Sequence, residues 1–440
     1  MQTIHIPKTI VVQGSSVLSG RVNVQGSKNS ALSLIPSLLL ANGISTLGRV
    51  PDLLDIHYML SFVESLGAKV IYKNNLLEVN PDVMFERKRD PDIDHLRRIR
   101  AAYYFIPVLL RISGTAILPM PGGCPIGARK SDFLFDALVA FGADVSFKDE
   151  YVYVEAKQLR AVKYKLPYPS QSVSAILLDI AVLAEGETIL ENISKNPEIE
   201  NKLSLLRSLG ADITSRSDGV VHIIGNKDMN GVDFNVMSDR IVAATWIAAA
   251  GITNGIIELP VDATDNLGTE MQYFRSLGLI VDQHDKNWTR YSFAEESKPI
   301  SVETGPYPSF GTDIQPFITV LASARAAWGS TITERVFDKR FRFIEHLESM
   351  GYRYELKSSE NIVCPNGESA QIARVIRMDM DQLAGCDVEA TDLRAGMALL
   401  LAGCRAKGHT RIRNAEQLYR GYENFENIIS ELGGMVTKEV

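Results

Sequence analysis

The chain has 440 residues, of which 45% are apolar and 22% are charged, and its formal net charge at pH 7 is −7. These values are typical of a globular enzyme and argue against nucleic acid as the main partner. The sequence contains no apolar run of about 18 residues, so we expect no membrane-spanning helix. The first residues lack the pattern of a signal peptide, and the four cysteines are scattered. We therefore expect a cytoplasmic protein without a disulfide framework.

The first elements along the chain set a pattern that recurs later. Residues 29–42 have helical apolar spacing, and Gly43 is expected to cap that helix. Residues 45–50 follow as a strand, and residues 52–67 show the helical period again. Residues 68–80 alternate in polarity around two asparagines, which predicts a hairpin.

Two short phrases each recur six times at intervals of roughly 70 residues. The first phrase, as in VESLGAKV, ends a helix and begins a strand; its glycines are Gly67, Gly142, Gly210, Gly278, Gly351 and Gly433. The second precedes it and joins an apolar helix to a strand; its glycines are Gly43, Gly114, Gly186, Gly255, Gly329 and Gly408. The chain therefore consists of six copies of one α/β repeat of helix, strand, helix and hairpin.

The six repeats are expected to form two domains, because 440 residues exceed what one hydrophobic core normally serves. The polar stretch at residues 226–239 marks the division. One predicted domain spans residues 28–237 and contains repeats one to three. The other is discontinuous; it joins residues 1–27 to residues 238–440 and contains repeats four to six.

A polar residue recurs near the start of the first helix of every repeat. These residues are Lys28, Arg100, Ser172, Asp239, Asp313 and Asp392. Pseudo-symmetric repeats should turn equivalent helix starts toward a common place, and helix N-termini favour anions. Serine and aspartate are also ordinary helix caps. Lysine and arginine are poor caps. An anion site between the two domains is therefore favoured by Lys28, Arg100 and Arg394, which lies two residues after Asp392.

Five motifs resemble those of the enolpyruvyltransferases. They are GSKN at residues 26–29, PGGCPIGAR at 121–129, SFGTDIQ at 309–315, ATDLRA at 390–395 and YRGYEN at 419–424. The likeness runs from about residue 8 to residue 436. The cysteine loop resembles the branch of the family that acts on UDP-N-acetylglucosamine in peptidoglycan synthesis. The branch that acts on shikimate 3-phosphate lacks this loop.

The resemblance implies a fold, a reaction and two substrates. The fold is a pair of inside-out α/β barrels that close over the substrates, with the N-terminal segment packed on the second domain. The reaction moves the enolpyruvyl group of phosphoenolpyruvate to the 3-hydroxyl of a UDP-sugar and releases phosphate. No cofactor is implied. The seven histidines show no paired spacing, so we also predict no metal ligands.

The resemblance also assigns roles to residues. It implies that Lys28 and Arg129 hold the phosphate of phosphoenolpyruvate and that Arg394 and Arg420 hold its carboxylate. Asp313 is the implied base for the sugar hydroxyl, and Asp392 belongs to the same catalytic set. The implied contacts of the nucleotide or sugar are Asn29, Arg100, Asp132, Phe133, Ser172, Val173 and Ile332.

Cys124 lies in a loop with glycines on both sides, near Arg129, whose charge favours the thiolate. By resemblance it is a proton donor or covalent partner of phosphoenolpyruvate and the site alkylated by fosfomycin. Cys404, within an apolar helix, instead has the surroundings of an inert buried thiol.

Three positions depart from the pattern of the peptidoglycan branch. Ser170 and Ser174 stand where that branch usually has lysine and glycine, and Asn196 stands where glutamate is common. The lost lysine weakens the case for a diphosphate. The alternatives are therefore a paralogue acting on a nucleotide such as uridine monophosphate, an idle paralogue that binds UDP-sugars, or the shikimate-pathway enzyme.

Overall fold

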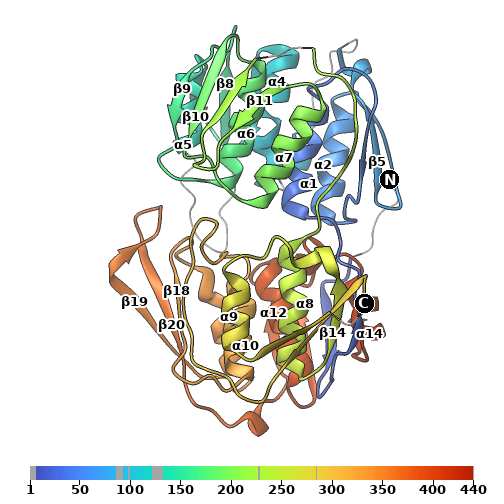
Figure 1. The fold of residues 1–440 in the computed structure, drawn as a ribbon, viewed down its shortest axis with the longest axis vertical. Coiled ribbons are helices and arrows are strands. Elements are labelled where there is room, and N and C mark those ends of the chain that lie inside the picture. Colours follow the sequence, from blue (N-terminus) through green and yellow to red (C-terminus); the bar gives the residue numbers. More distant parts are fainter. Residues whose placement is uncertain are drawn as a thin grey trace. The chain divides into compact units, whose positions relative to one another are not determined.

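The computed structural model describes residues 6–85, 93–97, 100–120, 132–225, 228–283 and 285–439. The chain folds into two compact domains (Figure 1). Domain I is built from described residues between Gly26 and Met237, and domain II from Ser238 onward together with the N-terminal residues up to Gln25. Gly26 and Ser27 were predicted for the other domain. They belong to domain I because the Ser27 N–H donates to the Met237 carbonyl (2.7 Å) and the Ser27 hydroxyl caps a helix of domain I.

Domain I contains the first three repeats. Its helices are α1 (Lys28–Leu38), α2 (Leu54–Ser65), η1 (Asp82–Phe85), α3 (Asp94–Arg97), η2 (Arg100–Phe105), α4 (Ile106–Ser113), α5 (Asp132–Ala140), α6 (Gln171–Leu183) and α7 (Pro197–Ser208). Its strands are β3 (Ser45–Gly48), β4 (Lys69–Lys73), β5 (Leu76–Asn80), β6 (Thr115–Pro119), β7 (Asp144–Lys148), β8 (Tyr151–Glu155), β9 (Lys163–Lys165), β10 (Glu187–Glu191), β11 (Asp212–Ser215), β12 (Val221–Ile224) and β13 (Asp233–Asn235). The order of helix, strand, helix and hairpin confirms the predicted repeat.

Domain II contains the last three repeats and the N-terminal strands. Its helices are α8 (Arg240–Thr253), η3 (Val261–Thr264), α9 (Glu270–Ser276), α10 (Gln315–Ala324), η4 (Arg340–Phe343), α11 (Ile344–Ser349), η5 (Met380–Gln382), α12 (Leu393–Arg405), α13 (Glu416–Tyr419) and α14 (Phe425–Glu431). Its strands are β1 (Thr9–Gln13), β2 (Gly20–Arg21), β14 (Ile257–Pro260), β15 (Leu279–Asp282), β16 (Trp288–Phe293), β17 (Ser301–Glu303), β18 (Thr331–Glu334), β19 (Tyr354–Val363), β20 (Ser369–Val375), β21 (Asp387–Glu389), β22 (His409–Arg413) and β23 (Val436–Glu439).

The described strands form six small sheets, three in each domain. In domain I their orders are β13-β3-β5-β4, β6-β8-β7 and β11-β12-β10-β9. In domain II they are β15-β16-β14-β2, β17-β18-β20-β19 and β21-β22-β1-β23. The N-terminal strand β1 lies antiparallel between β22 and β23, where Ile10 is opposite Ile412.

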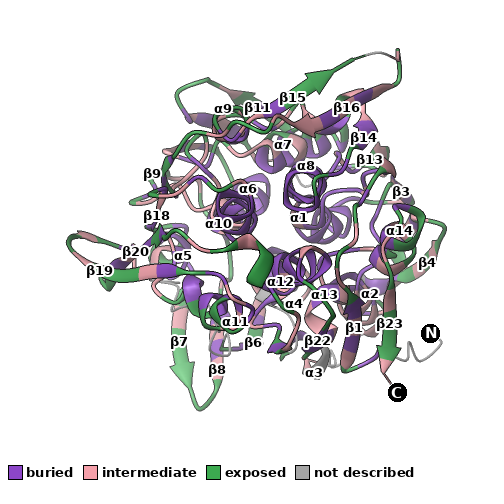
Figure 2. Ribbon diagram, turned by 90° about the horizontal axis from the view of Figure 1, so that it is seen from below, coloured by how far each residue is buried: buried purple, intermediate pink, exposed green. Residues whose placement is uncertain are grey.

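The first helix of each repeat lies inside its domain, and the sheets lie outside. In domain II the helices α8, α10 and α12 pack against one another, and every residue of α8 and α10 is buried. Figure 2 shows these helices in the colour of buried residues, whereas most residues of the outer strands β15 and β19 are exposed. A helix surrounded by protein must be apolar on all sides. Polar side chains of α8, α10 and α12 that reach solvent are therefore confined to the helix ends.

The recurring glycine of the first phrase has a conformational reason. All six of these glycines have positive φ, between 89° and 103°, where the chain turns from the second helix into the hairpin. This region of φ is unfavourable for residues with a Cβ atom. The prediction for Gly43 was wrong in detail, because α1 ends at Leu38 and Gly43 lies in the following turn.

Domain I contains a buried ion pair within its core. Lys202 Nζ lies 2.6 Å from Asp179 Oδ2, and neither side chain is exposed. The ammonium also donates to the Ser33 carbonyl (2.8 Å) and the Ser37 hydroxyl (2.5 Å), so the pair ties α1, α6 and α7 together. Burial raises the pKa of Asp179 and lowers the pKa of Lys202, while their mutual attraction opposes both shifts.

Within the described ranges, no helix has the length and apolar character required to cross a membrane. The same ranges contain no group of three His, Cys, Asp or Glu side chains arranged to hold a metal ion.

Replacing one partner of the buried pair should destabilise the protein strongly. Asp179→Ala leaves the Lys202 ammonium buried without a counter-charge, so the free energy of unfolding should fall by about 3–5 kcal/mol. The double variant Asp179→Leu/Lys202→Met should recover most of that loss, because it removes both charges and keeps the volume. Urea denaturation followed by circular dichroism measures both effects. Equal losses in the single and double variants would contradict this view of the pair.

Candidate active site

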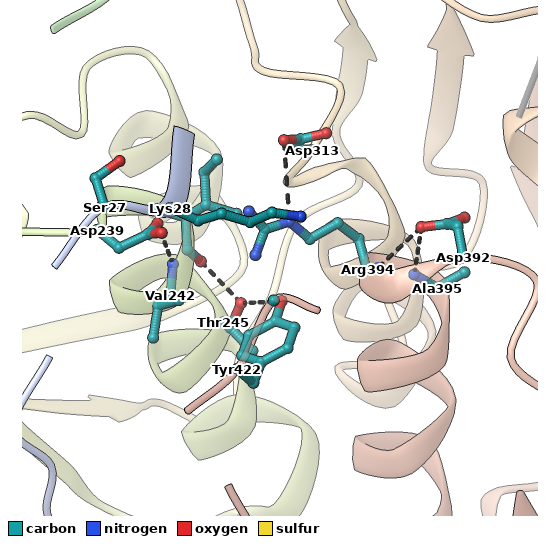
Figure 3. A network of polar contacts seen from close by, with 12 residues as sticks. Ser27, Lys28, Asp239, Val242, Thr245, Asp313, Asp392, Arg394, Ala395 and Tyr422 are labelled. Atoms are coloured by element: carbon teal, nitrogen blue, oxygen red, sulfur yellow. Dashed lines mark hydrogen bonds and ion pairs between the residues drawn. The ribbon is translucent and has the colours of Figure 1, made fainter. Parts of the chain in front are cut away.

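Two of the three central helices of domain II begin with an aspartate cap. Asp239 accepts hydrogen bonds from the N–H groups of Ile241 (2.9 Å) and Val242 (3.1 Å) at the start of α8. Asp392 does the same for Arg394 (2.8 Å) and Ala395 (3.1 Å) at the start of α12 (Figure 3). One oxygen of each aspartate, Oδ1, accepts both bonds, so these residues fix the helix starts as the capping pattern predicts.

The third aspartate, Asp313, lies two residues before α10 and contacts guanidinium groups instead. Its Oδ1 lies 3.3 Å from Arg340 NH2. Its Oδ2 lies 3.9 Å from Arg394 Nε (Figure 3). Arg340 NH1 in turn lies 3.5 Å from Asp392 Oδ1. Both arginine side chains are only 2% exposed, whereas that of Asp313 is 33% exposed. Asp313 is therefore the member of this charge cluster that reaches solvent.

The two guanidinium groups retain unused hydrogen-bond donors. Among the described residues, Nε and NH1 of Arg394 and Nε of Arg340 have no hydrogen-bond partner. Burial opposes the charge of Arg394, but Tyr422, Asp313 and Asp239 together hold its pKa above the usual value. Burial likewise opposes the charge of Arg340, and Asp392 and Asp313 raise its pKa. Permanently charged guanidiniums with unused donors can bind a carboxylate or phosphate.

The Arg394 guanidinium is held over an aromatic ring. Its central carbon lies 5.4 Å from the centroid of the Tyr422 ring, and the Tyr422 hydroxyl shares a hydrogen bond with the Thr245 hydroxyl (3.1 Å; Figure 3). Tyr422 is buried, so the ring supplies a fixed surface beneath the cation. The motif YRGYEN thus contributes both Arg420 and Tyr422, whose ring lies beneath the Arg394 guanidinium.

Arg420 follows helix α13 and is partly exposed. Its NH1 donates to Gln417 Oε1 (3.0 Å). The turn after it is held by the side chain of Gln25, which donates to the Gly421 carbonyl (3.3 Å) and accepts from the Glu423 N–H (2.8 Å). The N-terminal segment therefore fixes the turn that carries Arg420.

In domain I, Lys28 is the first residue of α1 and is almost fully buried. Its ammonium lies 2.8 Å from Asp55 Oδ2, in the first turn of α2, and the two side chains are 6% and 5% exposed. Ser27 caps α1 by accepting from the Ser30 N–H (3.3 Å). Asn29, the next residue after Lys28, is partly exposed. The pair with Asp55 fixes the position of the Lys28 charge.

The start of α6 carries Ser170 and Ser174, two of the positions at which the sequence departs from the expected pattern. Ser170 caps the helix, and its hydroxyl lies 3.4 Å from that of Ser172, which is partly exposed. Val173 is 6% exposed. Ser174 is fully buried and accepts from the Ser194 N–H (2.9 Å).

Asn196, at the start of α7, belongs to the same network. The Ser194 hydroxyl donates to the Asn196 side-chain oxygen, and the Asn196 N–H reaches the Ser194 hydroxyl at 3.4 Å. Two of the three departures noted in the sequence, Ser174 and Asn196, are thus connected through Ser194. They form a neutral network that joins α6 to α7.

Several predicted residues are described only in part. Cys124 and Arg129 lie outside the described residues. For Arg100 and Asp132 only the backbone is described; Arg100 begins η2 and Asp132 begins α5. Phe133, the second residue of α5, is partly exposed.

Ile332 does not have the surroundings of a sugar contact. It is fully buried in the core of domain II, and on β18 it lies opposite Ala373 of β20. A ligand could reach this side chain only if the core opened, so we do not retain Ile332 among the proposed contacts.

The described cysteines have the properties of structural thiols. Burial raises the pKa of Cys404 to about 12 and that of Cys364 to about 11. A thiol with so high a pKa is a poor nucleophile at neutral pH. Cys404 is fully buried, as expected from the sequence.

The sequence interpretation missed Arg340 and Asp55. Arg340 lies in the basic, aromatic run KRFRF after β18, where it was not distinguished from surface arginines. Its side chain contacts Asp313, at the start of the same repeat, and Asp392, at the start of the next one. Asp55 was treated as an ordinary residue of the second helix. Only the packing of side chains that are far apart in the sequence shows that these two residues contact the predicted ones.

Comparisons with known proteins cover almost the whole chain. Residues 12–429 match the family of EPSP synthase (3-phosphoshikimate 1-carboxyvinyltransferase). The chain is 32% identical over 428 residues to UDP-N-acetylglucosamine 1-carboxyvinyltransferase of Halothermothrix orenii, covering 97% of this chain and 99% of the relative. It is 34% identical over 430 residues to the protein of the same name from Lawsonia intracellularis, covering 98% and 99%.

Two solved structures share the fold. The enolpyruvyl transferase NikO from Streptomyces tendae matches with a TM-score of 0.85 at 23% identity, covering 98% of this chain and 99% of that one. EPSP synthase from Acinetobacter baumannii matches with a TM-score of 0.67 at 16% identity and the same coverage. The chain therefore belongs to the EPSP synthase family. It is an enolpyruvyltransferase, which transfers the enolpyruvyl group of phosphoenolpyruvate, and the predicted fold class is confirmed.

Removing the buried guanidinium of Arg340 should impair this activity. Arg340→Met leaves Asp313 and Asp392 without the cation between them and removes a donor from the cluster. We expect kcat/KM for phosphoenolpyruvate to fall at least ~100-fold, measured as phosphate release, with near-UV circular dichroism as the test of folding. Arg335→Met is the matched control, because Arg335 is exposed and pairs only with Glu303 among the described contacts; its kcat/KM should be unchanged. A folded Arg340→Met variant with normal kcat/KM would contradict a role for this cluster in substrate binding.

Proposed function

We propose that this enolpyruvyltransferase moves the enolpyruvyl group of phosphoenolpyruvate to the 3-hydroxyl of UDP-N-acetylglucosamine and releases phosphate, as the first committed step of peptidoglycan synthesis. The support from sequence is the full-length identity of 32–34% to relatives that carry this name. The observation that carries the proposal is the cluster in domain II. There a partly exposed carboxylate, Asp313, lies beside two buried guanidiniums with unused donors.

The chemistry requires separate groups for the two anionic ends of phosphoenolpyruvate. In domain II, Arg394 and Arg420 are the proposed ligands of its carboxylate, because a planar guanidinium can bind both carboxylate oxygens. Arg394 is buried beside Asp313, and its NH1 has no hydrogen-bond partner among the described residues. In domain I, Lys28 is the proposed ligand of the phosphate, together with Arg129 by family likeness. Fixed, buried cations also stabilise the charge that develops in the transition state.

Asp313 is the proposed general base for the acceptor hydroxyl. It is the most exposed carboxylate of the cluster, and its contacts with Arg340 and Arg394 fix the direction of its oxygens. A positioned base of this kind typically contributes ~10²–10⁴-fold to the rate. Asp392 is proposed to act beside it by holding Arg340 and the start of α12.

The remaining roles rest on family likeness. Cys124 is the proposed proton donor or covalent partner of phosphoenolpyruvate and the target of fosfomycin. The proposed contacts of the nucleotide and sugar are Asn29, Arg100, Asp132, Phe133, Ser172 and Val173. No metal or cofactor is assigned a role in this reaction.

A second candidate acceptor is a nucleotide with fewer phosphates, such as uridine monophosphate. The observation that favours it is the neutral network at the starts of α6 and α7. Ser170 replaces the lysine of the family pattern, and Ser174, Ser194 and Asn196 bond to one another and add no charge. A single charge-assisted bond to a diphosphate is worth roughly 1–3 kcal/mol, so its absence disfavours a diphosphate acceptor. The exposed Lys195 lies next to this network and can supply a replacement charge.

Turnover with defined acceptors separates the candidates. The protein is incubated with phosphoenolpyruvate and one of UDP-N-acetylglucosamine, uridine monophosphate or shikimate 3-phosphate, and the released phosphate is measured. We expect release with UDP-N-acetylglucosamine. Release with uridine monophosphate alone would replace the first candidate by the second. Release with none of the three, combined with binding of a UDP-sugar, would indicate an idle paralogue.

A further inference from the structure

The segment that carries Asp313 is held by two buried carboxylates. This segment runs from Thr304, directly after β17, to Asp313, and we call it the Asp313 loop. Glu270 of α9 and Glu334 at the end of β18 both contact it, and both are fully buried. Neither glutamate was singled out from the sequence.

Glu334 binds the Asp313 loop at both of its ends. Its Oε1 accepts from the Thr304 hydroxyl (2.9 Å), and its Oε2 accepts from the Thr312 hydroxyl (3.0 Å). The Thr304 hydroxyl also accepts from the Arg335 N–H (2.9 Å). Thr312 is adjacent to Asp313, so the Thr312 bond restrains the residue next to the proposed base.

The same carboxylate also binds the segment that leads to Arg340. Glu334 Oε1 accepts from the N–H groups of Val336 (2.8 Å) and Phe337 (3.1 Å). This segment continues directly into η4, whose first residue is Arg340. The Glu334 carboxylate is therefore hydrogen-bonded to residues close in sequence to both Asp313 and Arg340, which form an ion pair.

Glu270 contacts the Asp313 loop at Gly311, two residues before Asp313. Its Oε1 accepts from the Gly311 N–H (3.2 Å) and lies 3.4 Å from Arg240 NH1, and its Oε2 accepts from the Gly268 N–H (3.1 Å). A Cβ atom at Gly311 would lie 3.3 Å from this carboxylate, so a glycine permits the close approach.

A purely structural explanation accounts poorly for Glu334. Burying a carboxylate is unfavourable unless its hydrogen bonds offset the lost hydration, and apolar side chains often stabilise a core equally well. The four bonds of Glu334 all go to the two segments that bear Asp313 and Arg340. Hydrogen bonds concentrated in this way restrict the position of side chains whose chemistry depends on geometry.

We propose that Glu334 is a positioning residue for the enolpyruvyl transfer, acting through the Thr312 hydroxyl on Asp313 and through the 336–337 backbone on Arg340. The proposal rests on the proposed role of Asp313 as base. Glu334 does not touch substrate in this account. Its contribution is to keep the Asp313 carboxylate and the Arg340 guanidinium in one arrangement.

The most selective test alters Thr312, because that change removes one bond of Glu334 and leaves the buried carboxylate in place. Thr312→Val keeps the shape of the side chain and loses the hydroxyl, and Thr312→Ser keeps the hydroxyl. We expect kcat of Thr312→Val to fall ~10–100-fold with KM for phosphoenolpyruvate nearly unchanged. Thr312→Ser should retain kcat within about threefold of the wild type.

Three further variants make the result interpretable. Thr331→Val, on the same strand as Glu334, loses a surface bond to Ser301 and should retain normal kcat. Ile10→Ala, in the sheet of β1, should lower the melting temperature without lowering the kcat of the folded protein. Glu334→Leu should lower kcat further than Thr312→Val, with circular dichroism at the assay temperature as the test of folding.

The outcomes distinguish this proposal from the proposed function. The positioning role would be overturned if Thr312→Val kept the wild-type kcat, or if Thr312→Ser and Thr312→Val lost kcat equally. The proposed function would still stand in that case, provided that the Asp313→Ala variant is inactive. Full turnover in Asp313→Ala would instead remove Asp313 as the base. A loss of kcat in Ile10→Ala equal to that in Thr312→Val would show that reduced stability alone explains the effect.

Discussion

One interaction organises the polar residues of domain II, the contact of a partly exposed carboxylate with two buried guanidiniums. Arg340 and Arg394 are each 2% exposed, and Asp313 is the more accessible partner. Buried arginines of this kind are stable only when charges and hydrogen bonds offset their lost hydration. Asp313, Asp392, Tyr422 and the helix starts supply that compensation. Nε and NH1 of Arg394 and Nε of Arg340 have no hydrogen-bond partner within the described part of the chain.

The fold explains why this cluster lies at helix starts. The central helices are enclosed by the sheets of their own domain, so their middle turns are apolar and polar groups are confined to the ends. Repetition of the same unit brings equivalent ends together within a domain. In domain II those ends carry Asp239, Asp313 and Asp392. The same repeat therefore builds the core and concentrates the polar residues.

Local features of the sequence predicted much of the fold and part of the site. Helix caps and positive-φ glycines are encoded within a few residues, so the repeat and the positions of Asp239, Asp392 and Lys28 could be predicted. Arg340 and Glu334 could not, because the side chains that they contact lie far away in the sequence; Asp313 is 27 residues from Arg340. Ile332 was chosen by family likeness alone, and the alternation of β18 directs it into the core. Side-chain contacts between residues far apart in the sequence are not encoded in any local pattern.

The central claim is that Asp313 acts on the acceptor hydroxyl while the arginines beside it bind phosphoenolpyruvate. The most direct test uses the Asp313→Ala variant. Its binding of phosphoenolpyruvate is measured by calorimetric titration in the presence of the acceptor that supports turnover by the wild type. The rate of phosphate release by the same variant is measured separately. The account predicts that phosphoenolpyruvate binds at least as tightly as to the wild type, because the competing carboxylate is gone, and that phosphate release is lost. Weaker binding of phosphoenolpyruvate with normal phosphate release would contradict it.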